Sequence, residues 1–245
     1  MRGLDKSQNK VTSFNWSEYV HEMFTEEELE FYRSIYSTRR FTTEVLGEFP
    51  SSDGQVFKKI DKAIRPLEHG EEVDLVSIDW GSGQGKDYTA IVRWNREKEV
   101  IGIDCWNELS PVEQIEKLRD LILNWRPRKV LVEQNSIGQI YLDMLKKEVG
   151  RYVRVDGFQT NNNSKNRIID NLSAAFEHER IRLPENDELR HELAVYEEQV
   201  TKTGLRTYNA QKGSHDDIVM ALAIGWDELD KSAHYSFSVY SNYRR

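Results

Sequence analysis

The hydrophobic positions divide the chain into two unequal parts near residue 72. The first part is strongly polar and shows no clear strand before a cluster of turn-forming residues at 50–54. It contains one well-marked helix, in which Thr25 and Glu28 form a possible capping box ahead of the apolar residues at 29, 31, 32 and 35. We interpret residues 1–72 as an appendage or connecting segment.

Three short apolar runs follow in close succession after residue 73. They cover residues 74–80 (DLVSIDW), 89–95 and 99–107, and the turn-like sequence NREK separates the last two. Runs of this length and composition are typical of strands, and short connections allow neighbouring strands to pair antiparallel. The pattern therefore predicts an antiparallel meander of three strands.

Beyond residue 107 the pattern changes to alternating helices and strands. Ser110 as the N-cap, Pro111 at the first helical position and Glu113 two residues later predict the start of a helix. The further elements that we expect are a strand at 129–133 (KVLVE), a helix around 140–145, a strand at 151–158, helices at about 165–179 and 186–199, a hairpin around 202–204 and an apolar helix from 215. These elements predict an α/β fold, with a mixed β-sheet of meander and parallel strands flanked by helices. We assign this domain to residues 73–232 and a C-terminal tail to residues 233–245.

Composition excludes several classes of protein. The chain has 245 residues, of which 38% are hydrophobic and 31% are charged, and this suits a globular core rather than a disordered chain. No run of about 18 apolar residues and no apolar signal segment occurs, so we expect no membrane contact and a cytoplasmic location. Because Cys105 is the single cysteine, an intrachain disulfide is excluded and a cysteine-based zinc site is disfavoured. The formal charge of −8 does not by itself indicate nucleic-acid binding, which depends on where the lysine and arginine residues lie.

A glycine-rich segment, GSGQGK at residues 81–86, follows the first predicted strand. A P-loop needs a glycine where Trp80 stands and a serine or threonine where Asp87 stands, so the segment fails both tests. A dinucleotide-binding fingerprint needs a later third glycine and a following helix, whereas a strand is predicted here. We interpret the segment as a hairpin loop with Asp79 and Asp87 at its two sides. Sugar kinases and actin-like ATPases also place an aspartate and glycines in their first hairpin, so an ATPase fragment remains an alternative.

Three separate segments place carboxylates beside strongly apolar sequence. Asp79 lies near the end of the first strand, Glu133 ends the strand at 129–133, and Asp216 and Asp217 open the last helix. Each alone has an ordinary explanation as a turn cap, a solvent-exposed acid at a sheet edge or a helix N-cap. An ionised carboxylate beside a buried strand is costly unless it is paired or binds a metal, and three segments share that cost. A site of carboxylate oxygens suits Mg²⁺ or Mn²⁺.

The order of these motifs resembles the ribonuclease H-like superfamily and, more narrowly, the nuclease domain of a tailed-bacteriophage terminase large subunit. The matching stretches are SIDWGSGQGKDYTAIV (77–92), VLVEQNSIG (130–138), TNNNSKNR (160–167) and HDDIVMALAIG (215–225). The stretch RFTTEVLGEFPSSDGQVF (40–57) is similar to the segment that joins the ATPase part of such proteins to the nuclease part. A full terminase large subunit also carries a P-loop ATPase, and this sequence has no P-loop, so we expect no translocation activity.

The resemblance implies metal-dependent endonuclease cleavage of double-stranded viral DNA during genome packaging, with two Mg²⁺ or Mn²⁺ ions at the scissile phosphate. Asp79 is then expected to bridge both ions, and Glu133 and one of Asp216 and Asp217 to complete the coordination. Asp87 and the other aspartate are candidates for the second ion or for positioning water. Adjacent residues on a helix point about 100° apart, so the two aspartates cannot do identical work. Which of them faces the metal stays open.

Five basic residues are candidates for contact with DNA phosphates. Lys165 and Arg167 lie near the start of a predicted helix, and Lys202, Arg206 and Lys212 lie in or beside the predicted hairpin. The partners that the resemblance implies are double-stranded DNA, the ATPase domain of the same large subunit, the terminase small subunit and the portal. The expected location is the procapsid portal in the host cytoplasm.

Three alternatives to a packaging nuclease remain at this point. A Holliday-junction resolvase shares the superfamily and the acidic site, but it is expected to act as a dimer on branched DNA. An actin-like or sugar-kinase-like ATPase fragment would bind nucleotide. A catalytically silent DNA-binding or capsid-docking module on the same fold would do neither. Cleavage of plasmid or linear duplex DNA without junction preference, and a nucleotide titration, distinguish these alternatives.

Overall fold

The computed structural model describes residues 2–5, 10–13, 20–48, 54–82, 87–134, 138–201 and 205–241, with side chains between residues 20 and 231. Three features discussed above lie partly or wholly outside the described residues. They are the turn cluster at 50–54, the glycine-rich loop at 83–86 and the hairpin turn at 202–204.

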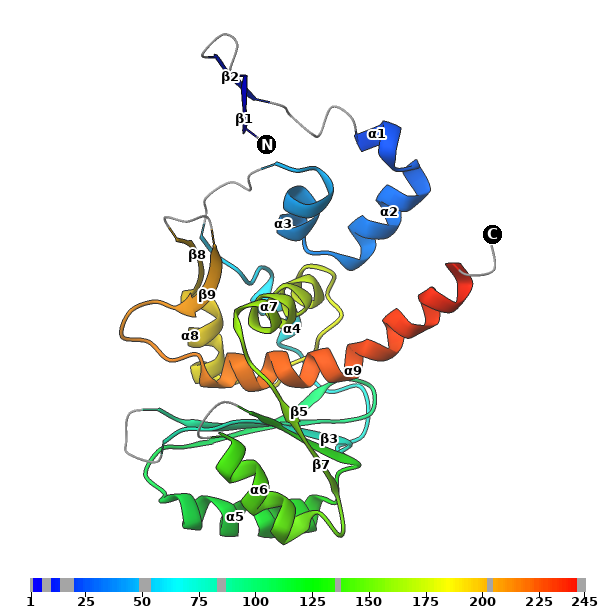
Figure 1. The fold of residues 1–245 in the computed structure, drawn as a ribbon. Helices are drawn as coiled ribbons and strands as arrows, with labels where there is room; N and C mark the ends of the chain where they lie inside the picture. Colours follow the sequence, from blue (N-terminus) through cyan, green and yellow to red (C-terminus); the bar gives the residue numbers. More distant parts are fainter. Residues whose placement is uncertain are drawn as a thin grey trace.

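A mixed sheet of five strands forms the centre of the molecule (Figure 1). Its strands lie in the order β5 (Val100–Trp106), β4 (Thr89–Trp94), β3 (Leu75–Asp79), β6 (Lys129–Glu133) and β7 (Arg154–Phe158). β3, β4 and β5 pair antiparallel, whereas β6 runs parallel to β3 and β7 runs parallel to β6. The predicted meander and the predicted mixed sheet are both confirmed.

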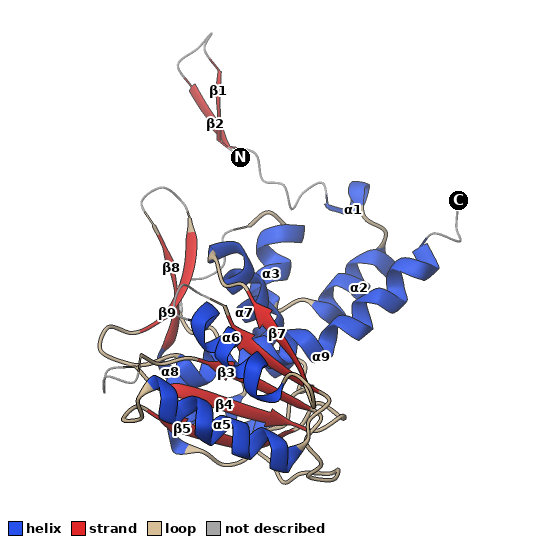
Figure 2. Ribbon diagram, turned by 60° about the horizontal axis from the view of Figure 1, so that its bottom comes forward, coloured by secondary structure: helices blue, strands red, loops and turns tan. Residues whose placement is uncertain are grey.

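Helices cover both faces of this sheet. α5 (Pro111–Trp125) and α6 (Gly138–Val149) lie on one face, and α7 (Asn162–Glu177), α8 (Asp187–Val195) and α9 (Asp217–Ser241) lie on the other (Figures 1 and 2). Side chains of β3 alternate between the two layers, so that Val76 and Ile78 pack with α5 and α6 while Leu75 packs with α7 and α9. The same alternation places Asp79 on the α9 side. No helix within the described ranges combines the length and the apolar character needed to cross a bilayer.

α9 lies unusually close to the sheet at Gly225. A Cβ atom at this position would lie 2.2 Å from Trp94 Nε1 and 2.5 Å from Ser77 Oγ, which are themselves joined by a hydrogen bond of 2.9 Å. The glycine therefore lets the helix backbone rest directly on β3 and β4. This contact fixes α9 over the strand whose last residue is Asp79.

The helix starts follow the local capping chemistry. Thr25 opens α2 (Glu26–Ile35) and Ser110 opens α5, each with the predicted capping box. α7 begins three residues before the predicted position, because the Asn161 side chain accepts a hydrogen bond from Ser164 N at 3.0 Å. Asparagine is among the preferred N-cap residues, so this start was readable from the sequence.

The predicted helix at 186–199 is wrong over its last four residues. α8 ends at Val195, and β8 (Tyr196–Val200) pairs antiparallel with β9 (Arg206–Ala210), which confirms the predicted hairpin around residues 202–204. Tyr196 and Tyr208 of this ribbon are 0% and 1% exposed and belong to the main core. Strand pairing and the burial of two aromatic rings outweigh the helical pattern of the local sequence.

The N-terminal region contains several short elements. They are β1 (Arg2–Asp5), β2 (Lys10–Ser13), α1 (Val20–Met23), α2, α3 (Thr38–Arg40), the π-helical turn η2 (Phe41–Val45) and α4 (Ile60–Ala63). The expectation of no strand before residue 50 is wrong, since β1 and β2 pair antiparallel; four residues each are too few for a periodic signal.

Val56, Phe57 and Ala63 pack in the main core, and α9 continues to Ser241. The domain boundaries near residues 72 and 232 stay predictions.

Candidate metal centre

Asp79 and Glu133 lie side by side at the carboxyl ends of two parallel strands. Ile78 pairs with Val132 in the β3–β6 register, so Asp79 and Glu133 follow as the next pair of neighbours. Each is only 7% exposed. Burial, the charge of Glu133 and a hydrogen bond between the two carboxyl groups raise the pKa of Asp79 well above its ordinary value, and Asp217 and Asp216 add to the effect. Two buried acids in contact are the centre of the predicted acidic set.

Asp217, the first residue of α9, is tied to the loop between β3 and β4. Its Oδ2 accepts a hydrogen bond from Tyr88 N at 3.2 Å and lies 3.6 Å from His215 Nδ1. Burial raises the pKa of Asp217 to about 6; the Tyr88 hydrogen bond opposes this, while the charges of Asp216 and Asp87 add to it. The two sides of the hairpin mouth lie close together because residue 81 is glycine, since a Cβ atom there would lie 2.3 Å from Asp87 O. The glycine-rich segment thus has a packing role beside the acids.

Asp216 has a different partner from Asp217. Its carbonyl oxygen accepts the first hydrogen bond of α9, from Met220 N at 2.9 Å, so Asp216 is the N-cap residue. Its carboxylate Oδ2 lies 3.1 Å from Lys165 Nζ, and the same ammonium group lies 3.4 Å from Asn209 Oδ1 on β9. The structure therefore separates the two adjacent aspartates, placing one against the β3–β4 loop and the other against α7.

Glu192 on α8 is a buried acid at this site that the sequence interpretation missed. It is 7% exposed, and its Oε2 accepts hydrogen bonds from Ile218 N and Val219 N at 2.9 and 3.0 Å. Burial raises the pKa of Glu192 to about 8, which the bond from Val219 opposes and the charge of Asp217 increases. A signal was present, because Glu192 falls on the same helical stripe as the buried residues Leu189 and Leu193.

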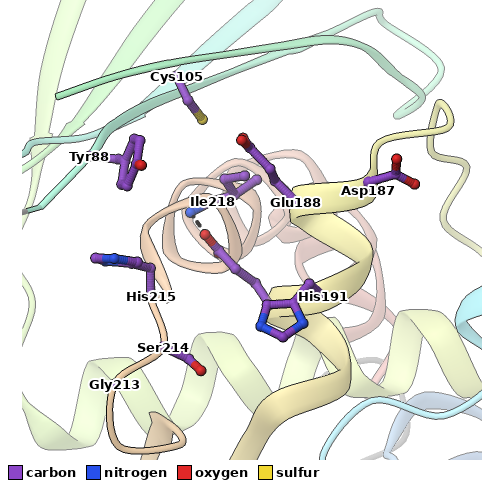
Figure 3. A pocket seen from close by; sticks show the side chains of 10 residues that line it. Tyr88, Cys105, Asp187, Glu188, His191, Gly213, Ser214, His215 and Ile218 are labelled. Atoms are coloured by element: carbon purple, nitrogen blue, oxygen red, sulfur yellow. Dashed lines mark hydrogen bonds between the residues drawn. The ribbon is translucent and has the colours of Figure 1, made fainter.

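A pocket of about 360 Å³ opens between α8, β5 and the start of α9 (Figure 3). Its walls combine acids, two histidines and apolar groups, and they are formed by Tyr88, Cys105, Asp187, Glu188, His191, Glu192, Gly213, Ser214, His215 and Ile218. The rings of Tyr88 and His215 meet edge to face at 5.2 Å. Burial raises the pKa of the Cys105 thiol to about 12, so this cysteine is a packed thiol rather than a thiolate ligand.

The donor set of the acidic site fits a hard divalent cation, although its side chains have not closed to ligand spacing. Within the described ranges, the set of three ligand side chains with atoms inside 4.8 Å of one another is Glu68, His69 and Glu99. The charge of that set is already compensated, since Arg182 Nε lies 3.0 Å from Glu99 Oε1. At the acidic site, burial and the neighbouring charges of Glu133, Asp217 and Asp216 raise the pKa of Asp79. Asp87 is exposed and Asp216 is partly exposed.

The predicted DNA-contacting residues fall into different surroundings. Lys165 lies at the acidic site, and Lys212 is exposed in the turn after β9. Arg167 pairs with the buried Asp227 of α9, and Arg206 lies 3.1 Å from Asp170 Oδ1 and 3.2 Å from Glu198 Oε1. Lys202 lies outside the described residues.

A comparison with protein families matches residues 76–226 to the family described as the terminase RNaseH-like domain. The match covers more than half of the chain and includes the acidic residues Asp79, Asp87, Glu133, Glu192, Asp216 and Asp217. The chain belongs to this family. The order of its five strands and the helices on both faces are those of an RNase H-like α/β fold.

The relatives and solved structures that resemble this terminase RNaseH-like domain include several phage proteins. The terminase large subunit of Thermus phage G20c is 22% identical over 212 residues, which cover 81% of this chain and 43% of the relative. The large terminase nuclease of the same phage, solved with bound magnesium, aligns with a TM-score of 0.60 at 20% identity, over 72% of this chain and 98% of that one. The nuclease domain of subunit gp2 of bacterial virus Sf6 aligns with a TM-score of 0.55 at 10% identity, over 70% and 98%. The chain thus spans less than half the length of the curated relative.

Proposed function

We propose that this chain is a divalent-metal-dependent endonuclease domain that cuts double-stranded phage DNA during genome packaging. The observation that carries the proposal is the buried contact between Asp79 and Glu133, on the sheet face where Asp216 and Asp217 begin α9. Membership of the terminase RNaseH-like family supports it and removes the reason for preferring an ATPase fragment or a junction resolvase. Two buried carboxyl groups in contact are stabilised by sharing a proton, and a bound divalent cation would allow both to be ionised.

We propose Mg²⁺ or Mn²⁺ as the bound ions, because hard cations prefer carboxylate oxygens. Related terminase nucleases were solved with magnesium and manganese, and also with cobalt and zinc. We propose Asp79 and Glu133 as the central ligands, with Asp216, Asp217 and Asp87 closing the site. A bound ion would supply an activated water nucleophile and would stabilise charge on the phosphodiester. A site with two ions remains part of the proposal.

The residues around the carboxylates have roles that do not depend on the ion itself. Tyr88 N orients Asp217, and Lys165 compensates Asp216 and offers a positive charge toward an incoming phosphate. Lys212 is exposed and free to follow a DNA backbone, whereas Arg167 and Arg206 would have to leave buried carboxylates first. We therefore propose Lys165 and Lys212 as the principal phosphate contacts, and we retain Lys202, Arg167 and Arg206 as weaker candidates.

The partners follow from the same proposal. They are double-stranded DNA, the ATPase domain of the same large subunit, the terminase small subunit and the portal. The proposed location is the procapsid portal in the host cytoplasm. Contacts with DNA are expected to be mostly to phosphate, so binding should weaken steeply as salt rises.

The test is cleavage of supercoiled plasmid with Mg²⁺ or Mn²⁺. We expect nicking and degradation by the unmodified protein, and loss of both in EDTA and in Asp79→Asn. Asp120→Asn is the matched control, because Asp120 is 71% exposed on α5, on the opposite face of the sheet. Full cleavage by Asp79→Asn would refute the assignment of the metal centre. Cleavage restricted to branched DNA would favour a resolvase instead.

A further inference from the structure

The first turn of α9 obtains its cap from another helix. The first backbone N–H groups of any helix lack partners within the helix, and the N-cap side chain ordinarily accepts from the second or third of them. Asp216 is the N-cap residue of α9, so its own carboxylate would ordinarily bind Ile218 N or Val219 N. Both of these N–H groups instead donate to Glu192 Oε2, at 2.9 and 3.0 Å.

Glu192 reaches this position from α8, and its side chain is shielded from water. It is 7% exposed, and it lies 26 residues before Ile218 in the chain. Figure 3 marks the hydrogen bond that joins α8 to Ile218 across one side of the pocket. A buried acceptor of this kind holds the end of α9 more firmly than an exposed side chain, for which water competes.

The consequence falls on Asp216. Because its capping role is already filled, its carboxylate turns away from the helix end and meets Lys165 Nζ at 3.1 Å. We propose that Glu192 is a positioning residue of the metal centre: by capping α9 in place of Asp216, it releases the Asp216 carboxylate for metal binding. This inference rests on the proposed nuclease function, and it concerns how that site is assembled rather than whether it exists.

The two hydrogen bonds define what a side chain at position 192 must provide. Both hydrogen bonds end on the same oxygen, so the role requires one acceptor at the length of a glutamate side chain and does not require its charge. Glu192→Gln keeps the length and an acceptor oxygen. Glu192→Asp keeps the charge but withdraws the oxygens by one methylene, which leaves the N–H groups for Asp216 to cap.

The experiment is a calorimetric titration of Mn²⁺ into the metal-free protein, so that the readout does not depend on cleavage. We expect Glu192→Asp to bind Mn²⁺ about tenfold more weakly, the lower end of the usual cost of losing a residue that supports a metal ligand. Glu192→Gln should stay within about twofold of the unmodified protein. Glu188→Asp is the control, since Glu188 lies on α8 and lines the same pocket. The opposite order, with Glu192→Gln weak and Glu192→Asp unchanged, would overturn the proposal and would indicate that Glu192 acts through its charge.

A second arm tests whether Glu192 acts through Asp216. In an Asp216→Ala background, Glu192→Asp should cause no further loss of Mn²⁺ affinity, because no carboxylate remains to be drawn back to the helix end. An equal loss in both backgrounds would overturn the proposal. If the unmodified protein binds Mn²⁺ and cleaves plasmid while Glu192→Asp binds Mn²⁺ normally, this inference fails and the proposed function stands. Absence of both binding and cleavage in the unmodified protein overturns both.

Discussion

At neutral pH the buried charge of Asp217 lowers the free energy of unfolding of the metal-free protein, and this effect can be measured. Its side chain is 15% exposed, and burial raises its pKa from an ordinary 3.8 to about 6. A raised carboxyl pKa means that the folded state binds the proton more tightly than the unfolded state does. The contribution of protonated Asp217 to the free energy of unfolding is fully present below pH 3.8 and is lost as the pH rises through about 6. A shift of about two units corresponds to about 3 kcal/mol.

Asp217→Asn removes the charge but keeps an oxygen that can accept the hydrogen bond from Tyr88 N. We expect urea unfolding in EDTA at about pH 7.5 to show a free energy of unfolding up to about 3 kcal/mol higher than that of the unmodified protein. The difference should shrink at about pH 4, where Asp217 is protonated. Added Mn²⁺ should reverse the order, because a ligand that binds the folded state stabilises it.

The exposed acid Asp120 is the control for this prediction. Asp120→Asn should change the free energy of unfolding by no more than about 0.5 kcal/mol at either pH. The reasoning is refuted if Asp217→Asn is less stable than the unmodified protein in EDTA at about pH 7.5. A stabilisation that does not depend on pH would equally contradict it, since the stated cause is the charge of one carboxylate.

Three further predictions concern other described residues. Lys165→Ala should weaken DNA binding and reduce the slope of the logarithm of affinity against the logarithm of salt concentration by about one. Fluorescence anisotropy in the presence of Ca²⁺ measures this slope. An unchanged slope would exclude a phosphate contact by Lys165. Tyr208→Phe should lower the free energy of unfolding by about 1–3 kcal/mol in a urea titration, because the buried Tyr208 hydroxyl donates a hydrogen bond to Asp170 at 2.6 Å. Tyr152→Phe is the control at an exposed site and should have no effect. An equal effect of the two substitutions would contradict this reason. Cys105 should react with a thiol reagent at about pH 8 only after denaturant is added, because its pKa is raised to about 12; rapid reaction of the folded protein would show that the thiol is accessible and ionised.

The metal centre shows why an acidic set can be recognised before its geometry is known. Asp79 and Glu133 each end an apolar strand, and parallel strands that pair in register bring their carboxyl ends to one edge of the sheet. The side-chain alternation of period two then places both on one face. The expectation that these two acids lie together needed the strand assignment and the adjacency of the two strands, and the pairing of β3 with β6 confirms that they are neighbours. Their role as metal ligands stays a prediction.

Local chemistry also explains where the sequence interpretation succeeded and failed among the elements. The capping boxes at Thr25 and Ser110 involve residues three apart, so their sequences alone predict the helix starts. The segment from Tyr196 to Gln199 is predicted as helix but forms a strand, because β9 pairs with it and the Tyr196 ring is buried in the main core. That outcome depends on partner residues eight to fourteen positions away, which a local pattern does not contain.

The sequence by itself determined the mixed sheet, the helices that cover it and the positions of the acids at strand and helix ends. These depend on period, capping and turn chemistry over a few neighbouring residues. Only the tertiary structure decided that Asp216 meets Lys165 while Asp217 meets the β3–β4 loop, and that Glu192 caps α9. It also decided that Arg206 pairs with Asp170 and Glu198. The physical reason is that most of these partners come from elements distant in the chain, which the packing of α7, α8 and α9 on the sheet brings together, while Glu198 meets Arg206 across the β8–β9 pair.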